Sequence, residues 1–205
     1  SLVPDPGEGI DLLKGWRPDG PTMLASIDPQ GGVPKVYVAD PTVGATRNWI
    51  ADREGRLNLY WTPNRVLSLN AKPNKGAVVD FSGLWVDVDP KSGETPQDVL
   101  ERVRAVDYPH PPTVTLISGG GVQMFWKLRK PLPVGGSPDL YRIFGKPKED
   151  RTADDLALIA EHEARLWAGE GRCKALAETF GGDVECRNAD RIMRLPGTWN
   201  LPTKA

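Results

Sequence analysis

Residues 84–128 hold three apolar runs of strand length and one helix signature, with glycine or proline between them. The runs at 84–89, 113–117 and 122–128 have the pattern of strands, and the glycines at 119–121 join the last two as a hairpin. After the first run, Thr95 and Pro96 have the residue types that begin a helix. A strand, a helix and a hairpin in succession predict an α+β or mixed α/β fold, in which helices pack on a sheet.

The rest of the chain has weaker signals. The first 35 residues are rich in proline and glycine, which predicts an irregular segment that wraps over a surface. Alternating apolar residues predict strands at 36–38 and 57–61, with a short helix near 45–53. A proline- and glycine-bearing connector is expected at 131–147. Thr152 is expected to cap a long helical region that breaks near 169–171, resumes to Phe180 and stops at Gly181 and Gly182.

Composition limits the class of protein. The chain has 205 residues, of which 39% are hydrophobic and 26% charged, as in a soluble globular domain. We expect one domain, with an N-terminal subdomain at 1–55 and a core at 56–205. No apolar run approaches the ~20 residues that span a bilayer, and no signal peptide is indicated. The net charge of −1 means that any contact with nucleic acid must come from local patches.

The cysteines and the chain ends add two expectations. Cys173 and Cys186 lack the spacing of a zinc site, and the chain has only two histidines. A reduced, cytoplasmic setting therefore fits. Because Ser1 is not preceded by an initiator Met and the chain stops just after Lys204, we expect a fragment of a longer polypeptide.

Two carboxylates follow the first apolar run. Asp87 and Asp89 are two positions apart on the expected strand, so their side chains point to the same face and can converge on one cation. Carboxylate oxygens suit Mg²⁺, which keeps open positions for water and phosphate. The same pattern also occurs in sugar-nucleotide transferases, in phosphatases whose first Asp is the nucleophile, and in strand-to-turn junctions. The pair thus predicts a metal site whose chemistry it leaves open.

Further polar segments accompany the acid pair. Ser118, Gly119, Gly120, Gly121 and Gln123 lie at the expected hairpin, where glycine backbone N–H groups can approach an anion. The alternative is a plain flexible turn.

Residues 181–200 alternate acids and arginines in a way that no amphipathic helix needs. Asp190 can complete a three-carboxylate site, and Arg191 and Arg194 have the planar fork that suits phosphate. Alternatively, these residues form salt bridges that fix a turn.

In this order the segments resemble the archaeo-eukaryotic-type primase superfamily, specifically the primase-polymerase domains of phage and plasmid replication proteins. The resemblance runs from about Tyr60 to Lys204, and its most specific parts are WVDVDP at 85–90, SGGGVQMFW at 118–126 and DRIMRLPGTWN at 190–200. It implies an RRM-like catalytic core with a largely antiparallel sheet and an N-terminal extension. It also implies template-dependent nucleotidyl transfer on single-stranded DNA from NTPs or dNTPs, and a helicase domain in the same polypeptide.

The resemblance also implies roles for individual residues. Asp87, Asp89 and Asp190 are expected to be catalytic and to hold Mg²⁺ or Mn²⁺, while Asp183 is a rival for the third acid. The nucleotide is expected to contact the residues of the glycine hairpin and the two arginines of the last motif: Ser118, Gly119, Gly120, Gly121, Gln123, Arg191 and Arg194.

One position departs from the superfamily, whose second motif commonly ends in His where this chain has Gln123. A neutral amide can donate to phosphate but cannot become cationic. A single-strand binding module with a degenerate site is therefore the main alternative to an enzyme. Trp126 and Trp199 adjoin the motifs and are candidates for stacking on bases.

Overall fold

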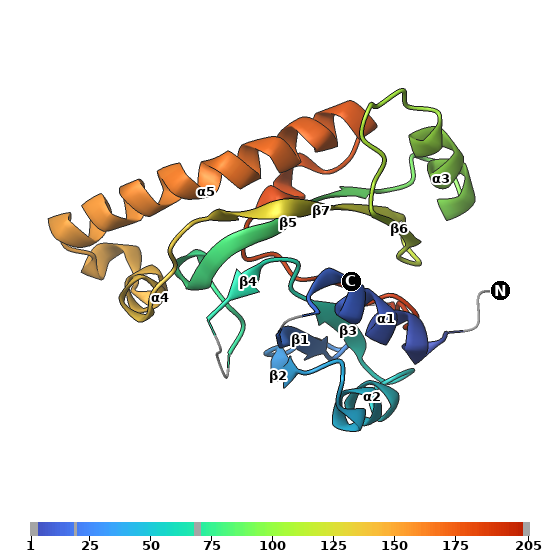
Figure 1. The fold of residues 1–205 in the computed structure, drawn as a ribbon, viewed down its shortest axis with the longest axis horizontal. Coiled ribbons are helices and arrows are strands. Elements are labelled where there is room, and N and C mark those ends of the chain that lie inside the picture. The colour runs from blue at the N-terminus through green and yellow to red at the C-terminus, as the bar shows by residue number, and fades with distance from the viewer. Residues whose placement is uncertain (1–3, 19, 68–70, 203–205) are drawn as a thin grey trace. The chain divides into compact units, whose positions relative to one another are not determined.

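The computed structural model describes residues 4–18, 20–67 and 71–202 (Figure 1). The chain divides into two compact units. The N-terminal unit comprises the described residues of 1–62, 68–72 and 192–205, and the central unit comprises 63–67 and 73–191. The segment that follows Arg191 therefore groups with the N-terminal residues, although it is far from them in sequence.

The N-terminal unit contains one antiparallel sheet and two helices. Its elements are α1 (Pro6–Trp16), β1 (Thr22–Ile27), β2 (Lys35–Ala39), α2 (Gly44–Ala51), β3 (Asn58–Trp61) and β8 (Met193–Arg194). The strand order is β2-β1-β3-β8. The expectation that the first 35 residues are irregular is wrong. Asp5 caps α1, whose buried side chains include Leu13 and Trp16, and Pro6 lies at the start of this helix, where a proline is accepted.

The central unit contains the second antiparallel sheet. Its elements are β4 (Arg65–Val66), η1 (Lys75–Ala77), β5 (Val78–Val88), α3 (Pro96–Arg104), β6 (Val114–Ile117), β7 (Val122–Pro133), α4 (Pro138–Gly145), η2 (Lys148–Asp150), α5 (Ala153–Phe180) and η3 (Val184–Arg187). The strand order is β4-β5-β7-β6. The two antiparallel sheets with packed helices confirm the predicted α+β class.

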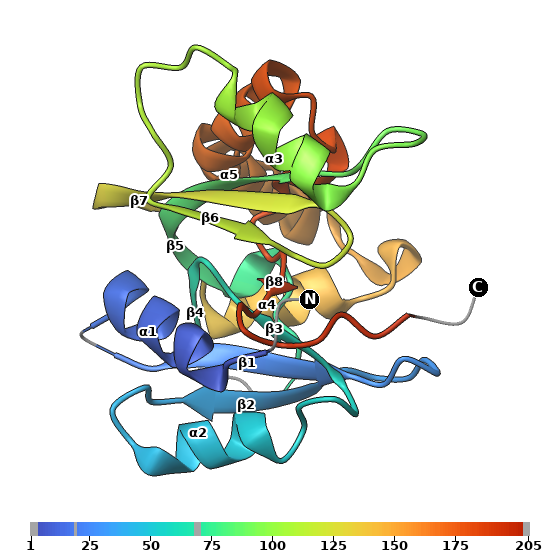
Figure 2. The same ribbon diagram turned by 90° about the vertical axis from the view of Figure 1, so that its right-hand side faces the viewer.

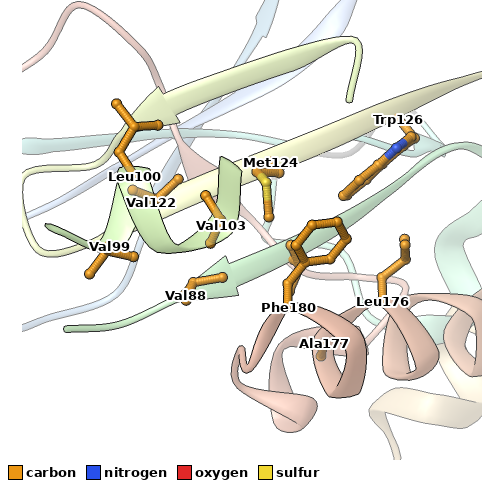
Figure 3. Close-up of a cluster of buried hydrophobic side chains, with 11 residues drawn as sticks. Val88, Val99, Leu100, Val103, Val122, Met124, Trp126, Leu176, Ala177 and Phe180 are labelled. Carbon is orange, nitrogen blue, oxygen red and sulfur yellow. The ribbon is translucent and has the colours of Figure 1, made fainter. Parts of the chain in front are cut away.

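Helices α3 and α5 cover the same face of the central sheet (Figures 1 and 2). Val88, Val122 and Met124 of the sheet meet Val103 of α3 and Phe180 of α5 in one buried cluster (Figure 3). Because side chains alternate along a strand, filling this face with Val86 and Val88 turns Asp87 to the opposite face. The core thus fixes the direction of the first acid.

Two expectations for the central unit are wrong, and packing explains one of them. Helix α5 runs unbroken through 169–171. Gly169 is required for close packing and does not end the helix, because a Cβ at this position would lie 2.5 Å from the ring of Phe81. The connector at 131–147 contains α4, which Ser137 caps and Leu140 and Ile143 anchor. The predicted caps Thr95 and Thr152 are confirmed, each within a capping box.

Among the described helices, none combines the length and the apolar character required to cross a bilayer.

Candidate functional site

Asp87 and Asp89 lie at the end of β5. Asp87 is half-buried and Asp89 is exposed. The backbone at Asp89 is held from α3, because Arg102 Nη2 donates to the Asp89 carbonyl oxygen at 3.3 Å. Glu94 holds that guanidinium in turn, through hydrogen bonds of 2.8 and 3.1 Å. The strand end is therefore anchored next to its exposed carboxylate.

Gln123 lies directly opposite Asp87 in the pairing of β5 with β7. Its Nε2 donates to Asp87 Oδ2 at 3.2 Å, and only 6% of the residue is exposed. Its Oε1 is buried and has no hydrogen-bond partner within the described part of the chain. The residue that departs from the superfamily pattern thus touches the first acid directly.

Asp183 reaches the same strand end through a glycine turn. Gly181 ends α5 with a left-handed φ of 68°, and Gly182 then passes so close to β5 that a Cβ would lie 2.6 Å from the Asp87 carbonyl oxygen. The Asp183 N–H donates to that oxygen at 2.8 Å. Among the described residues, β4 pairs with β5 only near Val78 and Asp80, so the edge of β5 is open here. The chain after α5 therefore takes the place of a strand partner.

Cys186 joins the acids to an arginine. Its Sγ lies 3.2 Å from Asp183 Oδ2 and 4.0 Å from Asp87 Oδ2. Arg191 Nη2 donates to the same sulfur at 3.1 Å. Burial, followed by the hydrogen bond with Asp183, raises the pKa of the Cys186 thiol to about 12, so the group is neutral at physiological pH.

The site carries concentrated negative charge. Burial raises the pKa of Asp87 to about 6, and the charges of Asp89 and Asp183 add to the shift. The amide of Gln123 and the charge of Arg191 oppose it. The pKa of Asp183 is held below its usual value, first by the N–H of Glu185 and then by the thiol. A cation bound here would relieve the repulsion on Asp87.

The predicted hairpin approaches the same place. Gly121 follows the turn between β6 and β7, and a Cβ on it would lie 2.4 Å from the Val88 carbonyl oxygen and 3.2 Å from Asp89 Cα. Gly119 has a φ of 81°, which favours glycine. Ser118 Oγ accepts the N–H of Gly121 at 3.2 Å, so the hydroxyl stabilises the turn.

The last motif is divided between the two units. Asp190 is half-buried and follows Ala189, whose N–H donates to Glu170 Oε1 at 2.9 Å. Arg191, by contrast, is exposed, and its charge acts on the carboxyl of Asp87. The motif thus places the positively charged guanidinium of Arg191 near the acid cluster, from within the central unit.

Arg194 belongs to the N-terminal unit, and its guanidinium has protein partners there. It donates to Asn58 Oδ1 at 2.9 Å and to the Tyr60 hydroxyl at 3.2 Å, and it also donates to Asn200. Its Cζ lies 4.5 Å from the centre of the Tyr60 ring, and only 9% of the residue is exposed. These contacts give Arg194 a structural role in joining β3 to β8. Its predicted role toward phosphate stays a prediction.

The donor set fits a hard divalent cation. Among the residues that the structure describes, no three His, Cys, Asp or Glu side chains converge into a complete protein cage for a metal. Mg²⁺ does not require such a cage, because it is commonly bound by one or two carboxylates together with water and substrate phosphates. The carboxylate oxygens of Asp87, Asp89 and Asp183, with the raised pKa of Asp87, have the chemistry of such an open site.

Sequence reasoning missed two residues of this neighbourhood. The spacing of Cys186 speaks only against a zinc site, and no sequence pattern singles out Arg102. The signal for Cys186 was its position three residues after Asp183, beyond a glycine pair. Of the two stacking candidates, Trp126 is 8% exposed and its Nε1 donates to the His110 carbonyl oxygen at 2.7 Å, which makes it a core residue.

Comparison with known proteins identifies the fold. No protein-family model matches the chain. No curated protein matches it in sequence. Among solved structures, the AEP domain of the cyanophage S-2L primase-polymerase is similar at a TM-score of 0.55 and 18% identity, over 95% of this chain and 83% of that one. Primase RepB′ gives a TM-score of 0.49 and 12% identity, over 97% of this chain and 52% of its own. The similarity to the cyanophage domain gives this chain the fold of an archaeo-eukaryotic-type primase-polymerase domain, as the sequence motifs implied.

Proposed function

We propose that this chain is a template-dependent nucleotidyltransferase that makes or extends strands on single-stranded DNA from NTPs or dNTPs. The observation that carries the proposal is the gathering of acids around Asp87 at the end of β5, in a domain with a primase-polymerase fold. The cyanophage protein is named for both priming and polymerisation, and the proposal extends that chemistry to this chain.

Mg²⁺ or Mn²⁺ would be held by Asp87 and Asp89, with a third carboxylate beside them. When bound, such ions stabilise the entering and leaving oxygens of an in-line phosphoryl transfer. We assign the third position to Asp183, because its main chain bonds to Asp87 and its charge raises the pKa of that carboxyl. The sequence favoured Asp190. The two assignments predict opposite rankings of the loss of Mn²⁺ affinity in Asp183→Asn and Asp190→Asn.

The remaining groups have roles toward the nucleotide. Arg191 is exposed and close enough to act on the charge of Asp87, so its guanidinium is available to a triphosphate that approaches the acids. The hairpin at Gly119–Gly121 lies against the strand end, where its backbone N–H groups are suited to an anion. Gln123 orients the carboxyl of Asp87 and favours its ionised form, because the amide N–H donates to that oxygen.

The direct test is synthesis by the purified chain. We expect labelled oligonucleotides when the chain is incubated with single-stranded DNA, nucleotides and Mg²⁺ or Mn²⁺. The double variant Asp87→Asn with Asp89→Asn should make none, because both changes remove ligand charge while keeping shape. A matched control is Asp107→Asn, which alters an exposed carboxylate in the segment after α3. Product that persists in the double variant would overturn the metal assignment. Tight DNA binding without synthesis by the unchanged chain would favour a binding module.

A further inference from the structure

We propose that Cys186 is a positioning residue, whose neutral thiol holds the Asp183 carboxylate and the Arg191 guanidinium in the arrangement that a metal-bound nucleotide requires. This inference rests on the proposed function. It goes further because it gives a role to a residue that neither the motifs nor general metal chemistry would select, since hard cations prefer oxygen ligands.

The thiol is held by its own main chain. The Cys186 N–H donates to the Asp183 carbonyl oxygen at 3.2 Å, and the Cys186 carbonyl oxygen accepts the indole N–H of Trp85 at 2.7 Å. Trp85 is 1% exposed and lies on β5 two residues before Asp87. The strand that carries Asp87 therefore also holds the backbone from which the Cys186 thiol projects.

From this fixed position the two nearest polar partners of the sulfur are of opposite charge, while Asp87 Oδ2 lies farther away at 4.0 Å. As a donor, the S–H points to Asp183 Oδ2 at 3.2 Å; as an acceptor, the sulfur receives Arg191 Nη2 at 3.1 Å. The other oxygen of the carboxylate, Asp183 Oδ1, accepts the N–H of Glu185 at 2.8 Å. Both oxygens are thus oriented, and each keeps lone pairs for a cation.

A neutral bridge has a physical advantage here. If Asp183 and Arg191 met in a direct ion pair, each would offset the charge that the other needs to present to a metal or a phosphate. Cys186 is 3% exposed, and its sulfur lies between the two groups, 3.2 Å from Asp183 Oδ2 and 3.1 Å from Arg191 Nη2. The thiol adds no charge of its own. The carboxylate stays a metal ligand and the guanidinium stays available to phosphate.

The test compares three cysteine variants by calorimetric titration with Mn²⁺, without nucleotide. Cys186→Ala should weaken Mn²⁺ binding by about tenfold, the lower end of the effect of losing a group that orients a metal ligand. Cys186→Ser should recover most of the affinity, because a hydroxyl also donates and accepts. Cys173→Ala is the matched control. Cys173 is also buried and lies in α5. The Cys173→Ala variant should bind Mn²⁺ with the affinity of the unchanged chain.

A double-mutant comparison separates positioning from loss of packing. If the thiol acts through Asp183, then Cys186→Ala should have no further effect on Mn²⁺ affinity in an Asp183→Asn background. Cavity formation alone would lower the free energy of unfolding in both Cys186→Ala and Cys173→Ala and leave the Mn²⁺ affinity of each unchanged.

The outcomes distinguish the two proposals. Weakened binding in Cys186→Ala, recovered in Cys186→Ser and absent from Cys173→Ala, supports the inference. Mn²⁺ affinity in Cys186→Ala equal to that of Cys173→Ala, in a chain that does bind Mn²⁺ and synthesise strands, would overturn the inference alone. A chain that neither binds Mn²⁺ nor makes product would overturn the proposed function and the inference with it.

Discussion

The backbone N–H of Asp183 donates a hydrogen bond to the carbonyl oxygen of Asp87 over 2.8 Å. These residues are far apart in the sequence, and the bond exists because Gly182 lets the chain after α5 pass against the open edge of β5. The contact brings a third acid beside the Asp87 and Asp89 pair. It also makes the geometry of the candidate metal site dependent on how a helix ends.

Removing the charge of Asp87 should stabilise the metal-free fold above pH 6. Because its pKa of about 6 lies above the ordinary 3.8, the folded chain loses stability as the pH rises between these values. In chelator, Asp87→Asn should raise the free energy of unfolding at pH 8 by up to about 3 kcal/mol, since one pKa unit is about 1.4 kcal/mol. The gain should vanish below pH 4. Urea denaturation across this pH range measures it, and a less stable variant at pH 8 would contradict the pKa assignment.

Loss of the Gln123 amide should shift metal binding to higher pH. The hydrogen bond from Gln123 lowers the pKa of Asp87, so Gln123→Met should let that pKa rise further. Because the ionised carboxylate binds the cation, the pH at which Mn²⁺ binding is half-maximal should increase. Calorimetry at several pH values measures this midpoint. Gln97→Met, on the exposed surface of α3, is the control, and an unchanged midpoint in Gln123→Met would argue against the interaction.

Asp183 and Asp190 should respond differently to loss of charge. Asp183→Asn should weaken Mn²⁺ binding on the order of tenfold or more, because it removes a carboxylate from the acid cluster. Asp190→Asn should have the smaller effect on the same Mn²⁺ titration. The opposite ranking would restore Asp190 as the third ligand.

A methyl group at Gly182 should displace the third acid. In Gly182→Ala the added Cβ would lie 2.5 Å from Val86 Cγ2 and 2.6 Å from the Asp87 carbonyl oxygen, so the turn must shift. We expect a loss of about 1–3 kcal/mol in the free energy of unfolding and a large loss of Mn²⁺ affinity. Gly145→Ala is the control, since its nearest neighbour would be Asn74 Nδ2 at 4.0 Å. Unchanged stability and affinity in Gly182→Ala would contradict the close approach.

Local patterns were sufficient for much of the central unit. The alternation before Asp87, the caps Thr95 and Thr152 and the glycines between β6 and β7 each act within a few residues, so the sequence alone predicted the strands, the helix starts and the hairpin. Proline and glycine gave wrong predictions of secondary structure where contacts with distant residues explain their presence. Gly169 looked like a helix break, but only the ring of Phe81 explains it.

The sequence by itself determined the acid pair, because strand periodicity puts Asp87 and Asp89 on one face whatever surrounds them. Only the tertiary structure decided which groups join the pair. The sequence ranked Asp190 above Asp183, and it gave Cys186 no role. The open edge of β5 brought Asp183 to the strand end and set Cys186 between that acid and Arg191. Contacts between segments distant in sequence depend on packing and on unpaired backbone groups, and no local pattern carries that information.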